Sequence, residues 1–407
     1  MSDIQPFKIA VSGDKLNRLK QKLALADFPD EVVDEKPWVR GPPLSDIRRL
    51  SHRWANGYDW RKAEAELNKF PQFITKISID NFDTYDVHFI HQRSTVENAI
   101  PLLFSHGWPG SFIEVTKILP ELVKGGKDYP AFHVVAPSLI DFGFSAAAKK
   151  KGFNVDQQTE MCHKLMLKLG YNEYVGQGGD VGYSVCRTLA RVYPENCKAH
   201  HVNMAVPNEP TAESHPELYA EMQRTPLTDF EQAGKARTAW FRNDGMAYFM
   251  IQGTRPQTIG YNVTDSPVGL LAWVWEKLHD WSDFEHYKWE DDEILTWISI
   301  YYFSTPGPAA TQRLYFEEMH RQPHGSFVES AKYLPVPLGI ANFPKELSIH
   351  PKLWHKTMGP VVHESTWDYG GHFASWERPE AIVQDLREMF GKGGGAEGVV
   401  SGKSGFE

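Results

Sequence analysis

A glycine-framed aspartate is the feature that most constrains how this chain can fold. The run Gly178-Gly-Asp180-Val-Gly182 follows the apolar segment 174–178 and precedes a helix-like stretch over 183–192. Glycine on both sides of a residue permits a turn that is too sharp for larger side chains. Such a turn from a strand to a helix lifts the central side chain above the sheet. The pattern therefore predicts an exposed, reactive carboxylate at Asp180.

The identity of this central residue restricts the chemistry. Carboxylate attack on an acyl carbon gives a reactive anhydride, whereas attack on a saturated carbon gives an ester that water can cleave. Asp180 thus favours epoxides or alkyl halides over ordinary esters as substrates. The same run, Gly176-Gln-Gly-Gly-Asp180, has some likeness to a dinucleotide-binding fingerprint, but no third glycine stands at the required place.

Short apolar runs alternate with helical stretches from residue 100 onward. We expect strands at 101–105, 132–136, 174–178 and 199–204, with helices at 112–123, 157–169 and from 183. This alternation predicts an α/β fold with a mostly parallel central sheet and helices on both faces. Strand texture returns at 337–341 and 360–364, and a helix at 379–390 closes the pattern.

The chain divides into five parts by this texture. Residues 1–95 form an N-terminal extension, with amphipathic helices at 14–25 and 45–70 and a β-hairpin, which we expect to pack on the core. The core comprises 96–206 and 326–390. Between them, the helical and aromatic segment 207–325 is predicted to be a lid, with an independent domain as the alternative. Residues 391–407 hold seven glycines and no apolar periodicity, which predicts a flexible tail.

A histidine after the last predicted strand is the candidate base. In α/β enzymes built on such a turn, the nucleophile, acid and base follow in that chain order. His372 lies in Gly370-Gly-His-Phe and occupies the third place. Glu346, after the preceding strand, is the expected acid partner; Asp368 is the alternative, although a carboxylate so near in sequence more often forms a turn.

Two further groups would complete the site. The loop His106-Gly-Trp-Pro-Gly110 follows the first core strand, so backbone N–H groups of Trp108 and Val181 are expected to form an oxyanion hole. Opening an epoxide also needs a donor to the departing oxygen, which a protonated phenol supplies well. Composition alone cannot choose among the candidate tyrosines that the insertion offers: Tyr248, Tyr261, Tyr301, Tyr302 and Tyr315.

With these motifs taken together, the chain from about residue 5 to 390 resembles the microsomal-type epoxide hydrolases, which have the α/β-hydrolase fold. The motifs are Trp54-Ala-Asn-Gly-Tyr-Asp-Trp, His106-Gly-Trp-Pro-Gly-Ser, Gly178-Gly-Asp-Val-Gly, Thr254-Arg-Pro-Gln-Thr, Asp265-Ser-Pro-Val-Gly-Leu, Phe343-Pro-Lys-Glu and Gly370-Gly-His-Phe. The resemblance implies Asp180 as nucleophile, Glu346 as acid and His372 as base. It also selects Tyr248 and Tyr315 as the phenols.

The implied activity is hydration of a small hydrophobic epoxide to a diol through an ester on Asp180. Many relatives have tryptophan where this chain has Val181, so the pocket near the ester should differ. The alternatives are a haloalkane dehalogenase with the same nucleophile, for which Val181 lacks a halide-binding N–H, and a non-catalytic binder of hydrophobic ligands. Which epoxide is used, its stereochemistry and the oligomeric state stay open, with a homodimer possible.

Charge and composition limit the partners. A formal net charge of −9 gives no basic footprint for nucleic acid. No signal peptide or membrane-spanning segment is evident, so we expect a cytoplasmic protein without the membrane anchor that some relatives carry. Cys162, Cys186 and Cys197 show no ligand spacing, and we expect neither a metal nor a cofactor.

Overall fold

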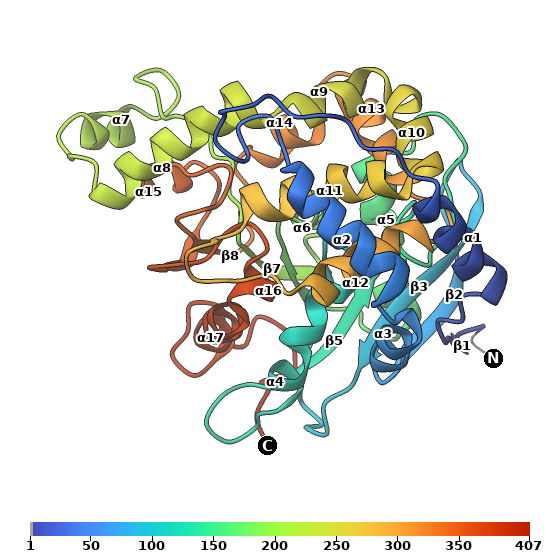
Figure 1. Ribbon diagram of the computed structural model, residues 1–407. Helices are drawn as coiled ribbons and strands as arrows, with labels where there is room; N and C mark the ends of the chain where they lie inside the picture. The colour runs from blue at the N-terminus through green and yellow to red at the C-terminus, as the bar shows by residue number, and fades with distance from the viewer. Residues whose placement is uncertain (1–2) are drawn as a thin grey trace.

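A single twisted sheet organises the computed structural model, which describes residues 3–407 (Figure 1). In that range the spatial order of its nine strands is β1-β2-β3-β5-β4-β6-β7-β8-β9. The strands are β1 Gln5–Pro6, β2 Gln72–Ser78, β3 Thr84–Gln92, β4 Ile100–Ser105, β5 Phe132–Pro137, β6 Tyr174–Gly178, β7 Cys197–Val202, β8 Leu338–Asn342 and β9 Val361–Thr366. Strands β4 to β9 run parallel, and β3 joins β5 antiparallel. The predicted mostly parallel sheet is confirmed, and the N-terminal hairpin extends it.

The central strands explain where a site can form. Every residue of β4, β5 and β6 is buried, as expected for strands covered on both faces. Strand β4 pairs with β5 on one side and β6 on the other, so the strands after β4 are added to opposite sides of it. Ser105 and Gly178, the last residues of β4 and β6, are paired neighbours. The loops that follow them therefore meet at the carboxyl edge of the sheet, where ligands bind in such folds.

Helices pack on both faces of the sheet (Figure 1). Helices α5 (Val155–Lys168) and α6 (Val181–Val192) contact each other, and α6 also contacts β6 and β7. Helix α17 (Pro379–Phe390) contacts β8 and β9, and α4 (Leu119–Val123) contacts β5. Helix α6 begins at the residue after Asp180, so the nucleophile candidate lies at the start of a buried helix.

The segment between β7 and β8 forms a helical layer over the carboxyl edge, in yellow and orange in Figure 1. Its helices are α7 Pro216–Met222, α8 Asp229–Trp240, α9 Ala247–Thr254, α10 Pro256–Asp265, α11 Pro267–Trp281, α12 Asp291–Tyr302, α13 Arg313–Met319 and α14 Ser326–Ser330. The N-terminal helices pack on this lid: Arg53 pairs with Asp292 at 2.8 Å, and Trp54 Nε1–H donates to Ser299 Oγ at 3.1 Å. The extension therefore supports the lid as well as the sheet.

One predicted helix is two helices in the structure. After α1 (Gly13–Ala24), the expected helix over 45–70 divides into α2 (Leu44–Asn56) and α3 (Trp60–Leu67). Gly57 ends α2, and the Asp59 carboxylate accepts the first N–H groups of α3 from Arg61 and Lys62. The amphipathic stripe continues across the break, which is why periodicity alone did not reveal it.

The expectation of a flexible tail at 391–407 is wrong. Ala396 and Val400 are buried, and Gly405 joins two backbone hydrogen bonds: its N–H donates to Asn98 O at 2.7 Å and its O accepts from Ala131 N–H at 2.8 Å. Several of the glycines adopt positive φ at turns, including Gly405 at 77°. The glycine content therefore marks a sequence of turns packed on the core rather than an unfolded linker.

Candidate active site

Asp180 stands on a strained turn between β6 and α6. Its φ of 52° and ψ of −124° fall in a region that residues other than glycine rarely adopt. Glycines on either side permit this turn by close approach: a Cβ on Gly182 would lie 1.9 Å from Ser105 O, and one on Gly178 would lie 2.7 Å from the Gly182 carbonyl carbon. The glycine frame predicted from the sequence is thus required by the backbone packing.

The two oxygens of the Asp180 carboxylate have different partners. Trp108 N–H donates to Asp180 Oδ1 at 2.8 Å. Asp180 Oδ2 lies 3.6 Å from His372 Nε2. Val181 is the first residue of α6, and the first N–H groups of a helix have no partner within it. Of the two donors predicted for an oxyanion hole, Trp108 N–H therefore bonds to Oδ1, and Val181 N–H lies at the start of the helix that follows Asp180.

His372 and Glu346 form a buried pair. His372 Nδ1 lies 2.6 Å from Glu346 Oε1, and both side chains are almost fully buried. Glu346 follows β8, and His372 lies on the loop between β9 and the short helix α16 (Ala374–Glu377). The alternative partner, Asp368, is 83% exposed and pairs with Arg378 instead.

Two carboxylates control the charge of the imidazole. Burial acts to lower the pKa of His372, but the charge of Glu346 and the contacts with Asp180 outweigh it and raise the pKa to about 10. The imidazolium is therefore favoured while Asp180 is ionised. Loss of the Asp180 charge would remove part of this stabilisation and make His372 a better proton acceptor.

The structure separates the five candidate tyrosines. Tyr248 on α9 stacks on the Trp108 ring with centroids 5.1 Å apart, and Tyr315 on α13 meets the same ring edge-on at 5.8 Å. Both line one cavity with Asp180. By contrast, Tyr301 donates to Gly110 O at 2.7 Å, Tyr261 is 70% exposed, and Tyr302 packs on Trp54.

Burial keeps both phenols protonated. It raises the pKa of Tyr248 and of Tyr315 well above the ordinary value for a phenol, and the Asp180 charge acts in the same direction. The cavity that they share with Asp180 measures about 30 Å³. Its other walls are mostly apolar, from Val155, Val181, Phe249, Leu314 and Phe327, with Ser184, Glu318 and Ser326 also in the lining. A ligand pocket usually exceeds 300 Å³, so the lid side chains must move to admit a substrate.

A polar space lies on the other side of Asp180. It measures about 10 Å³, roughly the room for one water, and is lined by polar side chains that include Glu114, Gln177, Asn203 and His372. Gln177 Oε1 is buried and has no hydrogen-bond partner among residues 3–407. Asp180 therefore borders both a mostly apolar space that contains the phenols and a polar one.

Glu114 is a site residue that the sequence analysis missed. Its Oε1 accepts the Ser111 N–H at 3.1 Å in a capping box at the start of the 3₁₀ helix Phe112–Lys117. Burial raises the pKa of Glu114 to about 8, with His372 opposing this rise and Asp180 adding to it. The spacing Ser-x-x-Glu marks the cap in the sequence, but not its position beside the reacting groups.

Among residues 3–407, two groups of side chains have donor atoms close enough to share a metal ion. They are Asp283, Glu285 and His286 near the end of α11, and His363, Asp385 and Glu388 beside α17. Neither group contains Asp180, Glu346 or His372.

Comparison with known proteins gives consistent matches. Residues 4–115 match the family model described as epoxide hydrolase N terminus, and residues 100–239 match the α/β hydrolase fold. Epoxide hydrolase 1 of Sus scrofa is 34% identical over 423 residues, which cover 95% of this chain and 88% of that protein. The structure of the Aspergillus niger epoxide hydrolase matches with a TM-score of 0.80 at 31% identity, covering 95% of this chain and 96% of that one. The juvenile hormone epoxide hydrolase of Bombyx mori matches with a TM-score of 0.85 at 27% identity, covering 95% and 93%.

The sheet order, the elbow and the helical lid define an enzyme of the α/β-hydrolase fold. Within that fold, the chain belongs to the epoxide hydrolase family, and it is an epoxide hydrolase.

The expected location and assembly stay predictions. In residues 3–407, every helix is too short or too polar to cross a bilayer.

Proposed function

We propose that this enzyme hydrates a hydrophobic epoxide in two covalent steps centred on Asp180. In the first step, Asp180 Oδ2 attacks an epoxide carbon and the ring C–O bond breaks. Tyr248 and Tyr315 donate to the departing oxygen, which takes a proton from one of these phenols and becomes a hydroxyl group. The phenolate that is left is reprotonated, through water, by the proton that the His372 imidazolium gives up. The product of this step is a hydroxyalkyl ester on Asp180. Their position across the apolar cavity from Asp180 supports this role.

Ester formation changes the charge balance at the base. The ester no longer carries the Asp180 charge that helps to raise the pKa of His372. We infer that His372 then becomes neutral and removes a proton from water. Glu346, at 2.6 Å from Nδ1, holds the ring with Nε2 toward the ester. The enzyme would in this way acquire its base only after the nucleophile has reacted.

In the second step, the hydroxide equivalent attacks the ester carbonyl carbon. Because Oδ2 carries the alkyl group, Oδ1 becomes the oxyanion of the tetrahedral intermediate. Trp108 N–H already donates to this oxygen at 2.8 Å, and Val181 N–H is the second donor that we propose. Collapse of the intermediate breaks the acyl–oxygen bond, and the departing oxygen takes the proton that His372 removed from water, which releases the diol. The Asp180 carboxyl group then gives its proton to His372, so the carboxylate and the imidazolium are both restored.

The observation that best supports this proposal is that the two Asp180 oxygens have different partners. Oδ1 lies at a backbone donor and Oδ2 faces the base, which is the arrangement that both steps require.

Trapping the ester tests the proposal. His372→Gln should form the ester and fail to hydrolyse it, so mass spectrometry should find the protein heavier by one epoxide. Proteolysis should then place the added mass on the peptide that contains Asp180. An unmodified protein after incubation with a substrate that the wild-type enzyme consumes would contradict the covalent route.

A further inference from the structure

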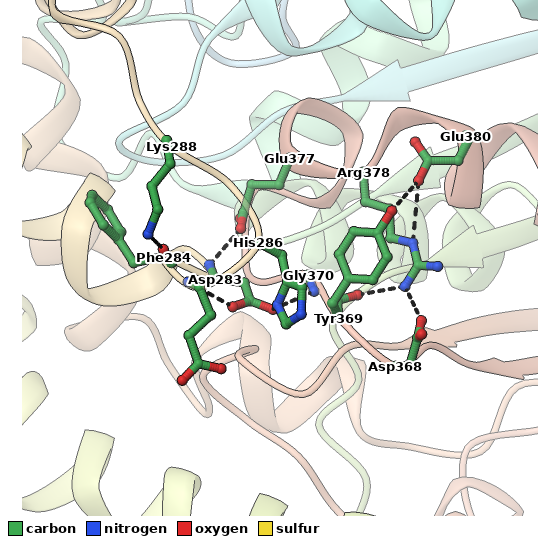
Figure 2. A network of polar contacts seen from close by, with 11 residues as sticks. Asp283, Phe284, His286, Lys288, Asp368, Tyr369, Gly370, Glu377, Arg378 and Glu380 are labelled. Atoms are coloured by element: carbon green, nitrogen blue, oxygen red, sulfur yellow. Dashed lines mark hydrogen bonds and ion pairs between the residues drawn. The ribbon is translucent and has the colours of Figure 1, made fainter.

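The loop that carries the base is held between the core and the lid (Figure 2). We define the base loop as residues 370–373. On its core side, Lys345 N–H donates to Gly370 O at 3.1 Å. On its lid side, His372 N–H donates to Trp281 O at 2.8 Å, and Gly370 N–H donates to Asp283 Oδ2 at 2.9 Å. Trp281 ends the lid helix α11, so the end of that helix fixes the backbone around His372.

The Asp283 side chain is buried where the base loop meets the lid. It is 1% exposed, and its Oδ2 also accepts His286 Nδ1–H at 3.0 Å. The fit between the loop and the lid is close, because a Cβ on Gly371 would lie 2.5 Å from Trp281 O and 3.0 Å from Asp283 N. Only a glycine at 371 lets the lid end and the base loop approach in this way.

A second carboxylate joins the same two segments. Glu377 Oε2 accepts Asp283 N–H at 2.6 Å, and Glu377 Oε1 accepts Phe373 N–H at 2.9 Å. Figure 2 shows Glu377 reaching the lid segment while the Asp283 carboxylate points to Gly370 and His286. Burial raises the pKa of Glu377 to about 8, and the charge of Asp283 adds to this rise. Three hydrogen bonds accepted by these two side chains, from the N–H groups of Gly370, Phe373 and Asp283, thus tie the base loop to the lid end.

The lid end also contacts the first-step groups. The Trp281 ring lies edge-on to His372 at 5.1 Å, 5.0 Å from the Tyr248 ring and 6.0 Å from the Trp108 ring. One segment of the lid therefore contacts the base and a phenol together.

We propose that Asp283, assisted by Glu377, is a positioning residue that latches the base loop to the lid and holds His372 over the Asp180 ester. This inference rests on the proposed role of His372 as base. A displacement of about 1 Å in such a group can slow a reaction by roughly a hundredfold. Asp283 does not face the phenols, so its loss should slow ester hydrolysis and leave ester formation unaffected.

The test is single-turnover kinetics with enzyme in excess over styrene oxide, in which the formation and the decay of the ester are followed separately by rapid quench and mass spectrometry. The variants are Asp283→Ala, which removes the acceptor, and Asp283→Asn, which keeps an oxygen for Gly370 N–H. Asp280→Ala is the matched control, since this α11 carboxylate also bonds to a neighbouring histidine, His279 at 2.8 Å. Partial unfolding lowers the amplitude of the ester signal, whereas its rates belong to the folded fraction.

The latch predicts that Asp283→Ala forms the ester within about twofold of the wild-type rate and hydrolyses it about tenfold to a hundredfold more slowly. Asp283→Asn should recover most of the hydrolysis rate, and Asp280→Ala should match wild type in both steps. Wild-type decay of the ester in Asp283→Ala, equal slowing of both steps, or no recovery in Asp283→Asn would overturn the latch. Absence of any ester in His372→Gln, in which hydrolysis is blocked, would instead overturn the covalent mechanism, and the latch with it.

Discussion

The two spaces beside Asp180 differ in the side chains that line them. On one side, Tyr248 and Tyr315 lie against the Trp108 ring around a mostly apolar cavity. Burial raises the pKa of both phenols, so both stay protonated. On the other side, His372 and Glu114 line a small polar space. The apolar side suits ring opening, in which a neutral donor meets a developing alkoxide. The polar side suits hydrolysis, in which water and a base must meet the ester. We infer from this difference that ring opening and ester hydrolysis use different sides of Asp180.

The largest effect should come from the phenol side. Tyr248→Phe and Tyr315→Phe remove the donors for ring opening, so each should slow ester formation by about tenfold to ten-thousandfold. Because hydrolysis uses the other side, the ester should not accumulate in either variant. Rapid-quench measurement of ester formation and decay checks this. Tyr302→Phe, a lid tyrosine outside the site, serves as the control, and accumulation of ester in a phenol variant would break the assignment of the two sides.

The charge link between the two sides gives a second prediction. Asp180→Asn imitates the neutral ester, so the pKa of His372 should fall from its raised value by roughly 1–3 pH units. Nuclear magnetic resonance titration can measure it, with His372→Gln used to assign the resonance. An unchanged pKa in Asp180→Asn would mean that the nucleophile does not control the base.

A part of this site was predictable from the sequence because it depends on local geometry. The elbow at Asp180 needs glycines at fixed positions, and the spacing of strands indicated both His372 and Glu346. The choice of Tyr248 and Tyr315 came only from family resemblance, since packing of α9 and α13 against Trp108 leaves no local signature. Asp283 contacts Gly370 across 87 residues, and no periodicity marks that contact.

The glycine content of a segment predicted its structure less well than the positions of its glycines relative to strands and helices. Glycines in the final segment indicated flexibility, but the structure uses them at positive φ and in close contacts, as at Gly395, where a Cβ would lie 2.3 Å from Val362 O. The same residue type at Gly182 was interpreted correctly, because there the neighbouring strand and helix specified a close approach.

The smallest effect concerns stability on the polar side. The pKa of Glu114 is raised to about 8, so the folded state keeps a proton that the unfolded chain releases near pH 4 to 5. The stability contributed by protonated Glu114 is thus full at acid pH and is lost as the pH rises through about 8. Glu114→Gln keeps the acceptor for Ser111 N–H and cannot ionise, so its melting temperature relative to wild type should rise between pH 5 and 8.

Scanning calorimetry at several pH values measures this difference, with the exposed Glu66→Gln as control. A constant difference across the range would show that Glu114 is ionised in the folded enzyme and that the polar side carries another negative charge.

A single turnover in oxygen-18 water, with enzyme in excess over an epoxide that it consumes, tests the covalent role of Asp180 most directly. The account predicts that the diol contains no label and that the heavy oxygen appears in the Asp180 carboxylate. Label in the diol from that first turnover, with none in Asp180, would contradict it.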